Sequence, residues 1–78
     1  MANVQQDRFY AWADGVGRGH GHVIEAGSFE AAAVGYAESY TPPADSDGEI
    51  RVYVASLEGG REHCFTVALD GGGPAPCD

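Results

Sequence analysis

One stretch near the middle of the chain has the periodicity of an amphipathic helix, and it constrains the fold more than any other feature. Between Ser28 and Pro42, apolar residues recur at helical spacing, namely Phe29, Ala32, Ala33, Tyr36, Ala37 and Tyr40. Ser28 can cap the first turn, and Pro42 with Pro43 ends the helix because neither residue has an amide hydrogen. A helix with a single apolar stripe has to lay it against another layer, so we expect a sheet beneath it.

Segments typical of strands flank this helix on both sides. Residues 8–12 are dense in aromatic side chains, and a second strand is expected over residues 20–25. After the helix, residues 50–57 alternate between apolar and other side chains, and a fourth strand follows the pair Gly59 and Gly60. The sequence therefore predicts an α+β domain in ββαββ order, with one helix on a four-stranded, mainly antiparallel sheet whose strand order stays open.

The domain is expected to span residues 7–70. Residues 1–6 are polar and unpatterned, so they are expected to fray, and residues 71–78 form a flexible tail of glycine and proline that is disordered or locally extended. Seventy-eight residues suffice for one small domain and leave no room for a separate cofactor domain. We therefore expect no cofactor.

The register of the last hairpin follows from its turn. Two adjacent glycines favour a two-residue turn with positive φ angles, which would place Val54 opposite Phe65, Val52 opposite Val67 and Ile50 opposite Leu69. These pairs would form the apolar face under the helix. The other face would receive Arg51, Tyr53, Ala55, Cys64, Thr66 and Ala68.

The balance of charges bears on the partners of the protein. The chain has twelve Asp and Glu residues, four Arg and no Lys, for a formal net charge of -8. Nucleic acids and anionic membranes require neutralising cations, so direct binding to them is disfavoured and a basic protein surface is the expected partner. With no long apolar run and no signal peptide pattern, we expect a cytoplasmic protein.

Seven carboxylates are candidates for contact with such a partner. Three alternate along the connector after the helix, two flank the last hairpin and two lie on the outer face of the helix, namely Asp45, Asp47, Glu49, Glu58, Glu62, Glu30 and Glu38. Residues two apart in an extended chain are about 6.6 Å from one another, close to the spacing of phosphates along a nucleic-acid strand. Charge mimicry of nucleic acid is thus one interpretation, and a solvated acidic surface without a partner is equally supported.

Three aromatic residues are expected to share the sheet face away from the helix, namely Tyr10, Trp12 and Tyr53. An uncovered face with aromatic and small side chains is typical of a surface that meets another protein. The partner could be a second copy of this chain, so a homodimer through this face is one expectation.

Histidine and cysteine residues suggest an alternative, a small metal- or thiol-dependent protein. His20 and His22 are two residues apart, and His63 with Cys64 could add ligands. A structural zinc site, however, usually needs four ligands in paired short motifs, and Cys64 has no evident activating base. We therefore predict no enzyme and no metal site, and we expect Cys64 and Cys77 to be reduced thiols.

Two segments carry a resemblance to a known family. Residues 21–33, with the helix cap, and the hairpin from Gly48 through Val67 resemble a family of very small uncharacterised proteins from alphaproteobacteria. The resemblance covers roughly residues 7–70 and implies no activity or functional residue. In size and acidity the chain is also similar in type to phage-borne anti-CRISPR inhibitors. The leading functional hypothesis is an inhibitor or adaptor that occupies a basic groove on a nucleic-acid-handling complex, and a housekeeping accessory domain is a further alternative.

Overall fold

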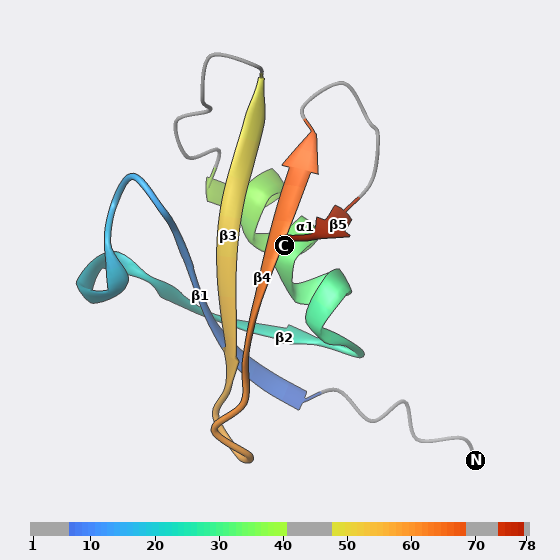
Figure 1. Ribbon diagram of the computed structural model, residues 1–78. Coiled ribbons are helices and arrows are strands. Elements are labelled where there is room, and N and C mark those ends of the chain that lie inside the picture. The colour runs from blue at the N-terminus through green and yellow to red at the C-terminus, as the bar shows by residue number, and fades with distance from the viewer. Residues whose placement is uncertain (1–6, 41–47, 69–73, 78) are drawn as a thin grey trace.

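The computed structural model describes residues 7–40, 48–68 and 74–77, and in it one helix packs on a five-stranded antiparallel sheet (Figure 1). The elements are β1 (Asp7–Ala13), the 3-10 turn η1 (Arg18–His20), β2 (His22–Ala26), α1 (Phe29–Tyr40), β3 (Glu49–Ser56), β4 (Glu62–Ala68) and β5 (Pro74–Pro76). The strand order is β2-β1-β3-β4-β5. The α+β class is confirmed, whereas the expectation of four strands is one strand short. At twelve residues, α1 is too short to cross a bilayer, and no other α-helix lies in the described ranges.

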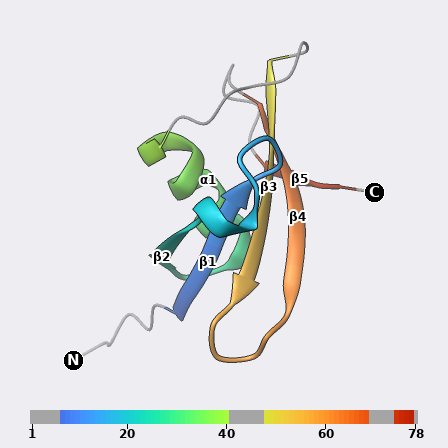
Figure 2. The same cartoon turned by 90° about the vertical axis from the view of Figure 1, so that its left-hand side faces the viewer.

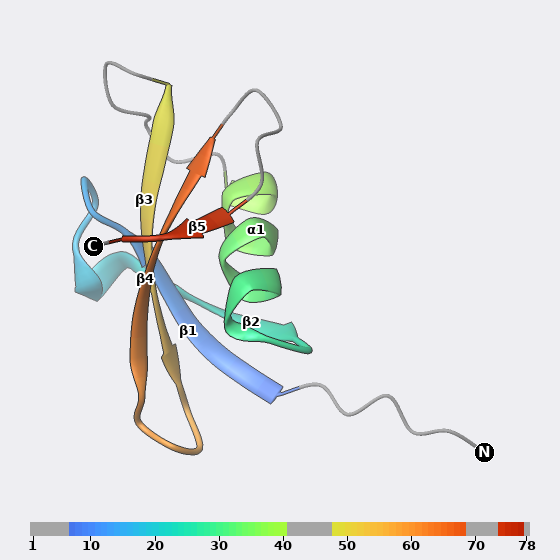
Figure 3. The same cartoon turned by 45° about the vertical axis from the view of Figure 1, so that its right-hand side comes forward.

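The helix begins and ends where its sequence pattern predicts. The Ser28 hydroxyl accepts a hydrogen bond from the Ala31 amide at 3.1 Å, and the Ser28 carbonyl accepts one from Ala32 at 3.0 Å. The first bond satisfies an amide that has no backbone partner within the first turn, and the second is the first i to i−4 bond of the helix. Figures 2 and 3 both show α1 on one side of β3 and β4.

The predicted stripe forms the helix side of the core. Ala32, Ala33, Tyr36 and Ala37 are buried, and Phe29 packs at the edge of the cluster. The sheet contributes the apolar side chains of its inner face, namely Phe9, Ala11, Ala13, Ala26, Ile50, Val52, Val54, Phe65 and Val67. The last predicted member, Tyr40, is 44% exposed at the end of the helix, where its ring stacks on that of His22 in the edge strand β2.

The β3–β4 hairpin has a different register from the predicted one. Val52 pairs with Phe65 and Ile50 with Val67, which is a shift of two residues, so the same side chains still face the helix. The physical reason is a longer loop. Ser56 and Arg61 close it through a backbone bond of 2.8 Å, and the Ser56 hydroxyl accepts the amides of Glu58 and Gly59. Leu69, the predicted partner of Ile50, lies outside the described residues.

The tail contains a fifth strand that the sequence analysis did not predict. β5 pairs antiparallel with β4 through Phe65↔Pro76, Thr66↔Ala75 and Val67↔Pro74. Cys77 follows directly, forms a disulfide with Cys64 and donates its amide to the Cys64 carbonyl at 3.0 Å. The expectations of an unpacked tail and of two reduced thiols are therefore wrong for residues 74–77. The cause is that alternate prolines fit an edge strand, which brings Cys77 opposite Cys64.

Candidate partner-binding surface

The outer face of α1 is acidic. Glu30 lies in the first turn and Glu38 near the end, both exposed, and the helix contains no Lys, Arg or His. At a rise of about 1.5 Å per residue, the two positions are about 12 Å apart along the helix axis. Ala31, Val34 and Gly35 lie between them and present no long side chain. This face therefore offers two separated carboxylates on a smooth surface.

The four arginines lie on other parts of the molecule. Arg8 and Arg51 alternate with buried neighbours of β1 and β3, so they project from the sheet face opposite the helix. Arg18 belongs to the η1 turn, which Figure 3 shows on the side of β3 and β4 away from α1. Arg61 precedes β4 at the tip of the hairpin. The arginines are thus separated from the acidic helix, because none of the four comes from α1 or from the chain that leads into it.

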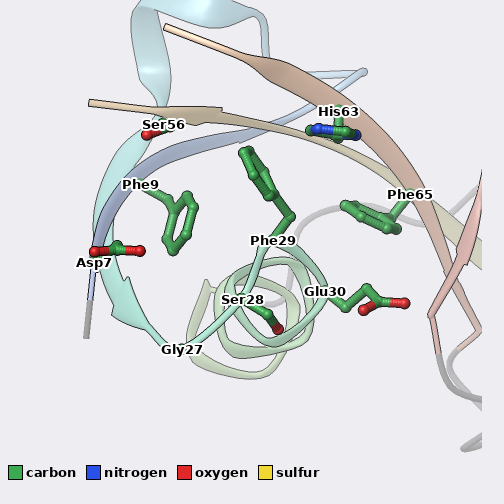
Figure 4. A pocket seen from close by; sticks show the side chains of 9 residues that line it. All are labelled: Asp7, Phe9, Gly27, Ser28, Phe29, Glu30, Ser56, His63 and Phe65. Carbon is green, nitrogen blue, oxygen red and sulfur yellow. The ribbon is translucent and has the colours of Figure 1, made fainter. Parts of the chain in front are cut away.

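A pocket lies at the N-terminal end of α1, where the helix meets the sheet (Figure 4). Its volume is about 470 Å³, and its lining comes from β1, the helix start, β3 and β4, namely Asp7, Phe9, Gly27, Ser28, Phe29, Glu30, Ser56, His63 and Phe65. Phe29 is central: its ring centroid is 4.9 Å from that of Phe9 and 4.2 Å from that of His63. Figure 4 shows Asp7 and Glu30 on opposite sides of these rings. The pocket therefore has an aromatic floor between two carboxylates.

This pocket was not among the predicted sites. Asp7 and Phe9 are two residues apart in a strand and share a face, and a helix starting at Phe29 has to pass over that strand. Both signals are present in the sequence. The missing information was the strand order, which places β4 and its His63 beside the helix start.

The three aromatic residues predicted on the other sheet face do lie together. Trp12 is central, with ring centroids 5.7 Å from Tyr10 and 5.5 Å from Tyr53. The prediction that this face is uncovered is wrong at its centre, since Trp12 is only 6% exposed and the Arg18 guanidinium lies 4.9 Å from its ring centroid. Tyr10 holds the covering turn in place, because its hydroxyl donates to the Arg18 carbonyl and accepts the Gly21 amide.

The remaining predicted carboxylates do not form one cluster with the helix. Glu49 begins β3 and is half-buried, and Glu58 is exposed in the hairpin loop. Glu62 forms an ion pair of 3.6 Å with Arg18, across the sheet face away from α1. Asp45 and Asp47 lie outside the described residues.

The structure does not bring the histidines and cysteines together. His20 lies in η1 instead of the second strand, while His22 stacks on Tyr40 with ring centroids 3.8 Å apart. His63 packs against Phe29, and Cys64 points to the opposite sheet face and is bonded to Cys77. Across the described ranges, no three His, Cys, Asp or Glu side chains are grouped so as to hold a metal ion. The thiol-dependent alternative lacks a free thiol at Cys64.

Comparison with known proteins places the chain in a family. Neither the curated proteins nor the solved structures yielded a match. A family model does match residues 7–78, a span that includes β1 through β5 and the disulfide. The chain therefore belongs to DUF5961, a family of unknown function.

Proposed function

We propose that this protein acts by binding: it occupies a basic groove on a nucleic-acid-handling complex and inhibits that complex, in the manner of an anti-CRISPR inhibitor. The observation that carries the proposal is the separation of the arginines from the acidic helix. Glu30 and Glu38 lie on a helix without cations, whereas Arg8 and Arg51 project from the opposite sheet face. A basic groove can thus approach the α1 side without meeting an arginine from that helix.

The pocket at the start of α1 supports a protein partner. An Arg or Lys side chain combines an apolar stem with a charged head. The stem would lie against the half-buried Phe29, and the head would reach Asp7 or Glu30 at the margin. A basic side chain at the centre of the contact would add burial of apolar surface to the attraction between charges.

The spacing of the helix carboxylates is compatible with mimicry of a nucleic-acid strand. About 12 Å separates Glu30 from Glu38 along the helix, roughly twice the 6.6 Å between alternate residues of an extended chain. The connector with Asp45, Asp47 and Glu49 is a second candidate for the same role. Either set of carboxylates would occupy positions that phosphates take in the groove.

The test is a quantitative capture experiment with tagged protein and nuclease-treated host lysate at low salt. The double variant E30Q/E38Q removes two negative charges from α1, and D14N/E25Q removes two exposed ones elsewhere. We expect the E30Q/E38Q variant to bind the captured partner about fivefold more weakly, because two exposed charge pairs of about 0.5 kcal/mol each contribute about 1 kcal/mol together. The control should bind as the unmodified protein does.

Competition separates mimicry from other modes of binding. If the protein occupies a nucleic-acid groove, an added DNA or RNA oligonucleotide should displace it, and salt should weaken the complex steeply. Equal binding by E30Q/E38Q and the control would reject α1 as the contact surface. A complex that resists both oligonucleotide and salt would reject mimicry.

The connector needs its own variant. D45N/D47N/E49Q should abolish inhibition while the circular dichroism spectrum stays unchanged, if the connector supplies part of the mimic. Unchanged affinity of this triple variant at low salt would leave the α1 face as the contact and exclude the connector.

A further inference from the structure

The Cys64–Cys77 disulfide is the covalent attachment of the outermost strand. Cys64 lies in β4 and Cys77 directly after β5, and their Cα atoms are 5.2 Å apart. The register makes them direct neighbours across the two strands, with the Cys77 amide bonded to the Cys64 carbonyl. The bond therefore joins β5 to the sheet at one end of the strand.

The backbone alone holds β5 weakly. The strand has three residues, and two of them, Pro74 and Pro76, have no amide hydrogen. Antiparallel pairing alternates hydrogen-bonded and non-bonded pairs, so Thr66↔Ala75 is the next bonded pair after Cys64↔Cys77. The amide donors are therefore those of Ala75 within β5 and of Cys77 directly after it. Loss of the disulfide should let β5 separate from β4.

The disulfide is open to an incoming reagent. A hollow of about 290 Å³ on the sheet face away from α1 is lined by Arg51, Tyr53, Cys64 and Cys77. Both cysteines are half-buried, and Arg51 is exposed. A guanidinium beside a disulfide attracts an approaching thiolate and stabilises the thiolate that leaves.

One of the two sulfurs is the better leaving group. The Thr66 hydroxyl oxygen lies 3.7 Å from the Cys77 sulfur. An oxidised sulfur has no proton, so the hydroxyl is the donor in this contact. The same hydroxyl can donate to the Cys77 thiolate after the bond breaks, and a stabilised thiolate leaves faster.

We propose that Cys64–Cys77 is a thiol–disulfide exchange site that releases β5 when a dithiol reduces it. One thiolate of the dithiol attacks the Cys64 sulfur, a mixed disulfide forms, and the Cys77 thiolate leaves and takes up a proton. The second thiolate of the dithiol then attacks its partner sulfur, and Cys64 leaves as the second thiol. The dithiol is oxidised to its own disulfide and supplies two electrons and two protons.

Release of β5 changes one edge of the sheet. Along β4, the Arg61 carbonyl points to β3, so the odd-numbered residues bond to β3 and the even-numbered ones to β5. The amides of Cys64 and Thr66 therefore lose their partners on reduction, whereas those of Phe65 and Val67 keep theirs. This inference does not depend on the proposed inhibitor function.

Amide hydrogen exchange of the full chain, before and after reduction with dithiothreitol, tests the release. We expect exchange at Cys64 and Thr66 to accelerate by about tenfold or more, with Phe65 and Val67 unchanged as internal controls. The variant C77S should give the reduced pattern without any reagent. Unchanged exchange at Cys64 and Thr66 in both the reduced protein and C77S would overturn the proposal.

The chemistry of the exchange is tested by rates and by trapping. Reduction by dithiothreitol should be about threefold or more slower in R51Q and T66V than in R8Q, a control arginine on the same sheet face. Glutathione, a monothiol, should be trapped on Cys64, as peptide mass mapping can show. Equal rates in all three variants, or a glutathione adduct on Cys77, would overturn the assigned direction of attack.

Discussion

Single residues in this fold are constrained most where the chain approaches itself closely. A Cβ atom on Gly21 would lie 2.6 Å from the Ala11 carbonyl oxygen and 2.7 Å from the Tyr10 ring. The Tyr10 hydroxyl donates to the Arg18 carbonyl and accepts the Gly21 amide, so it holds the turn at this point. The covering of Trp12 therefore depends on a glycine that was predicted to lie in the second strand without a specific role.

G21A should destabilise the protein by about 1 to 3 kcal/mol, because an added methyl group here has to displace backbone. G19A is the matched control, since nothing lies within 4 Å of a Cβ atom at that position. Urea unfolding followed by Trp12 fluorescence measures both variants. Equal midpoints for the two would contradict the close approach.

V52D should prevent folding, because Val52 has no exposed surface and an unpaired carboxylate there would be buried among apolar side chains. V23D makes the same change at a strand position that is 54% exposed, and it should leave the fold intact. Far-ultraviolet circular dichroism distinguishes the two outcomes. A folded V52D protein would refute the assignment of the inner sheet face.

At the scale of elements, local patterns were predictable and long-range pairing was not. The helix follows from its periodicity and from Ser28, both of which act within one element. The hairpin register was two residues off because Ser56 organises the loop, and because the Leu57 amide bonds to the Arg8 carbonyl in a third strand. β5 was missed because glycine and proline dominate its surroundings, although proline at alternate positions is compatible with an edge strand.

Of the candidate site, the positions within one element were predictable, and those that depend on contacts between elements were not. Glu30 and Glu38 follow from helical phase alone, and both are exposed as expected. Burial of Trp12 could not be predicted, because it depends on Arg18 folding back over β1, the strand that precedes its turn. Prediction of the pocket would have required the strand order, which no local sequence pattern contains.

S28A should lower the free energy of unfolding by about 1 kcal/mol, since the Ala31 amide loses its acceptor at the start of α1. S39A, near the exposed end of the same helix, is the matched control and should change stability little. Thermal unfolding monitored by circular dichroism measures both. If S39A lowers the free energy of unfolding as much as S28A does, the Ser28 cap makes no specific contribution to the stability of α1.

For the whole molecule, self-association depends on the net charge and on the aromatic residues of the outer sheet face, of which Trp12 is covered. A homodimer through the sheet face would need Trp12 as its anchor, but Arg18 covers that ring. With a net charge of -8, two copies also repel each other. We expect a monomer in sedimentation equilibrium at low salt and at high salt. A dimer that Y53A dissociates would show instead that the sheet face associates with Arg18 in place.

The two prolines of β5 have a consequence for how this protein behaves at high concentration. Ala75 pairs inward with Thr66, so the backbone of Pro74 and Pro76 faces away from β4. Within β5, the outward side thus offers carbonyl oxygens without a single amide donor, and an incoming strand from another molecule finds no donor to pair with. At the β5 edge, the sheet is therefore poorly suited to pairing with a further strand, which disfavours fibril growth from that edge.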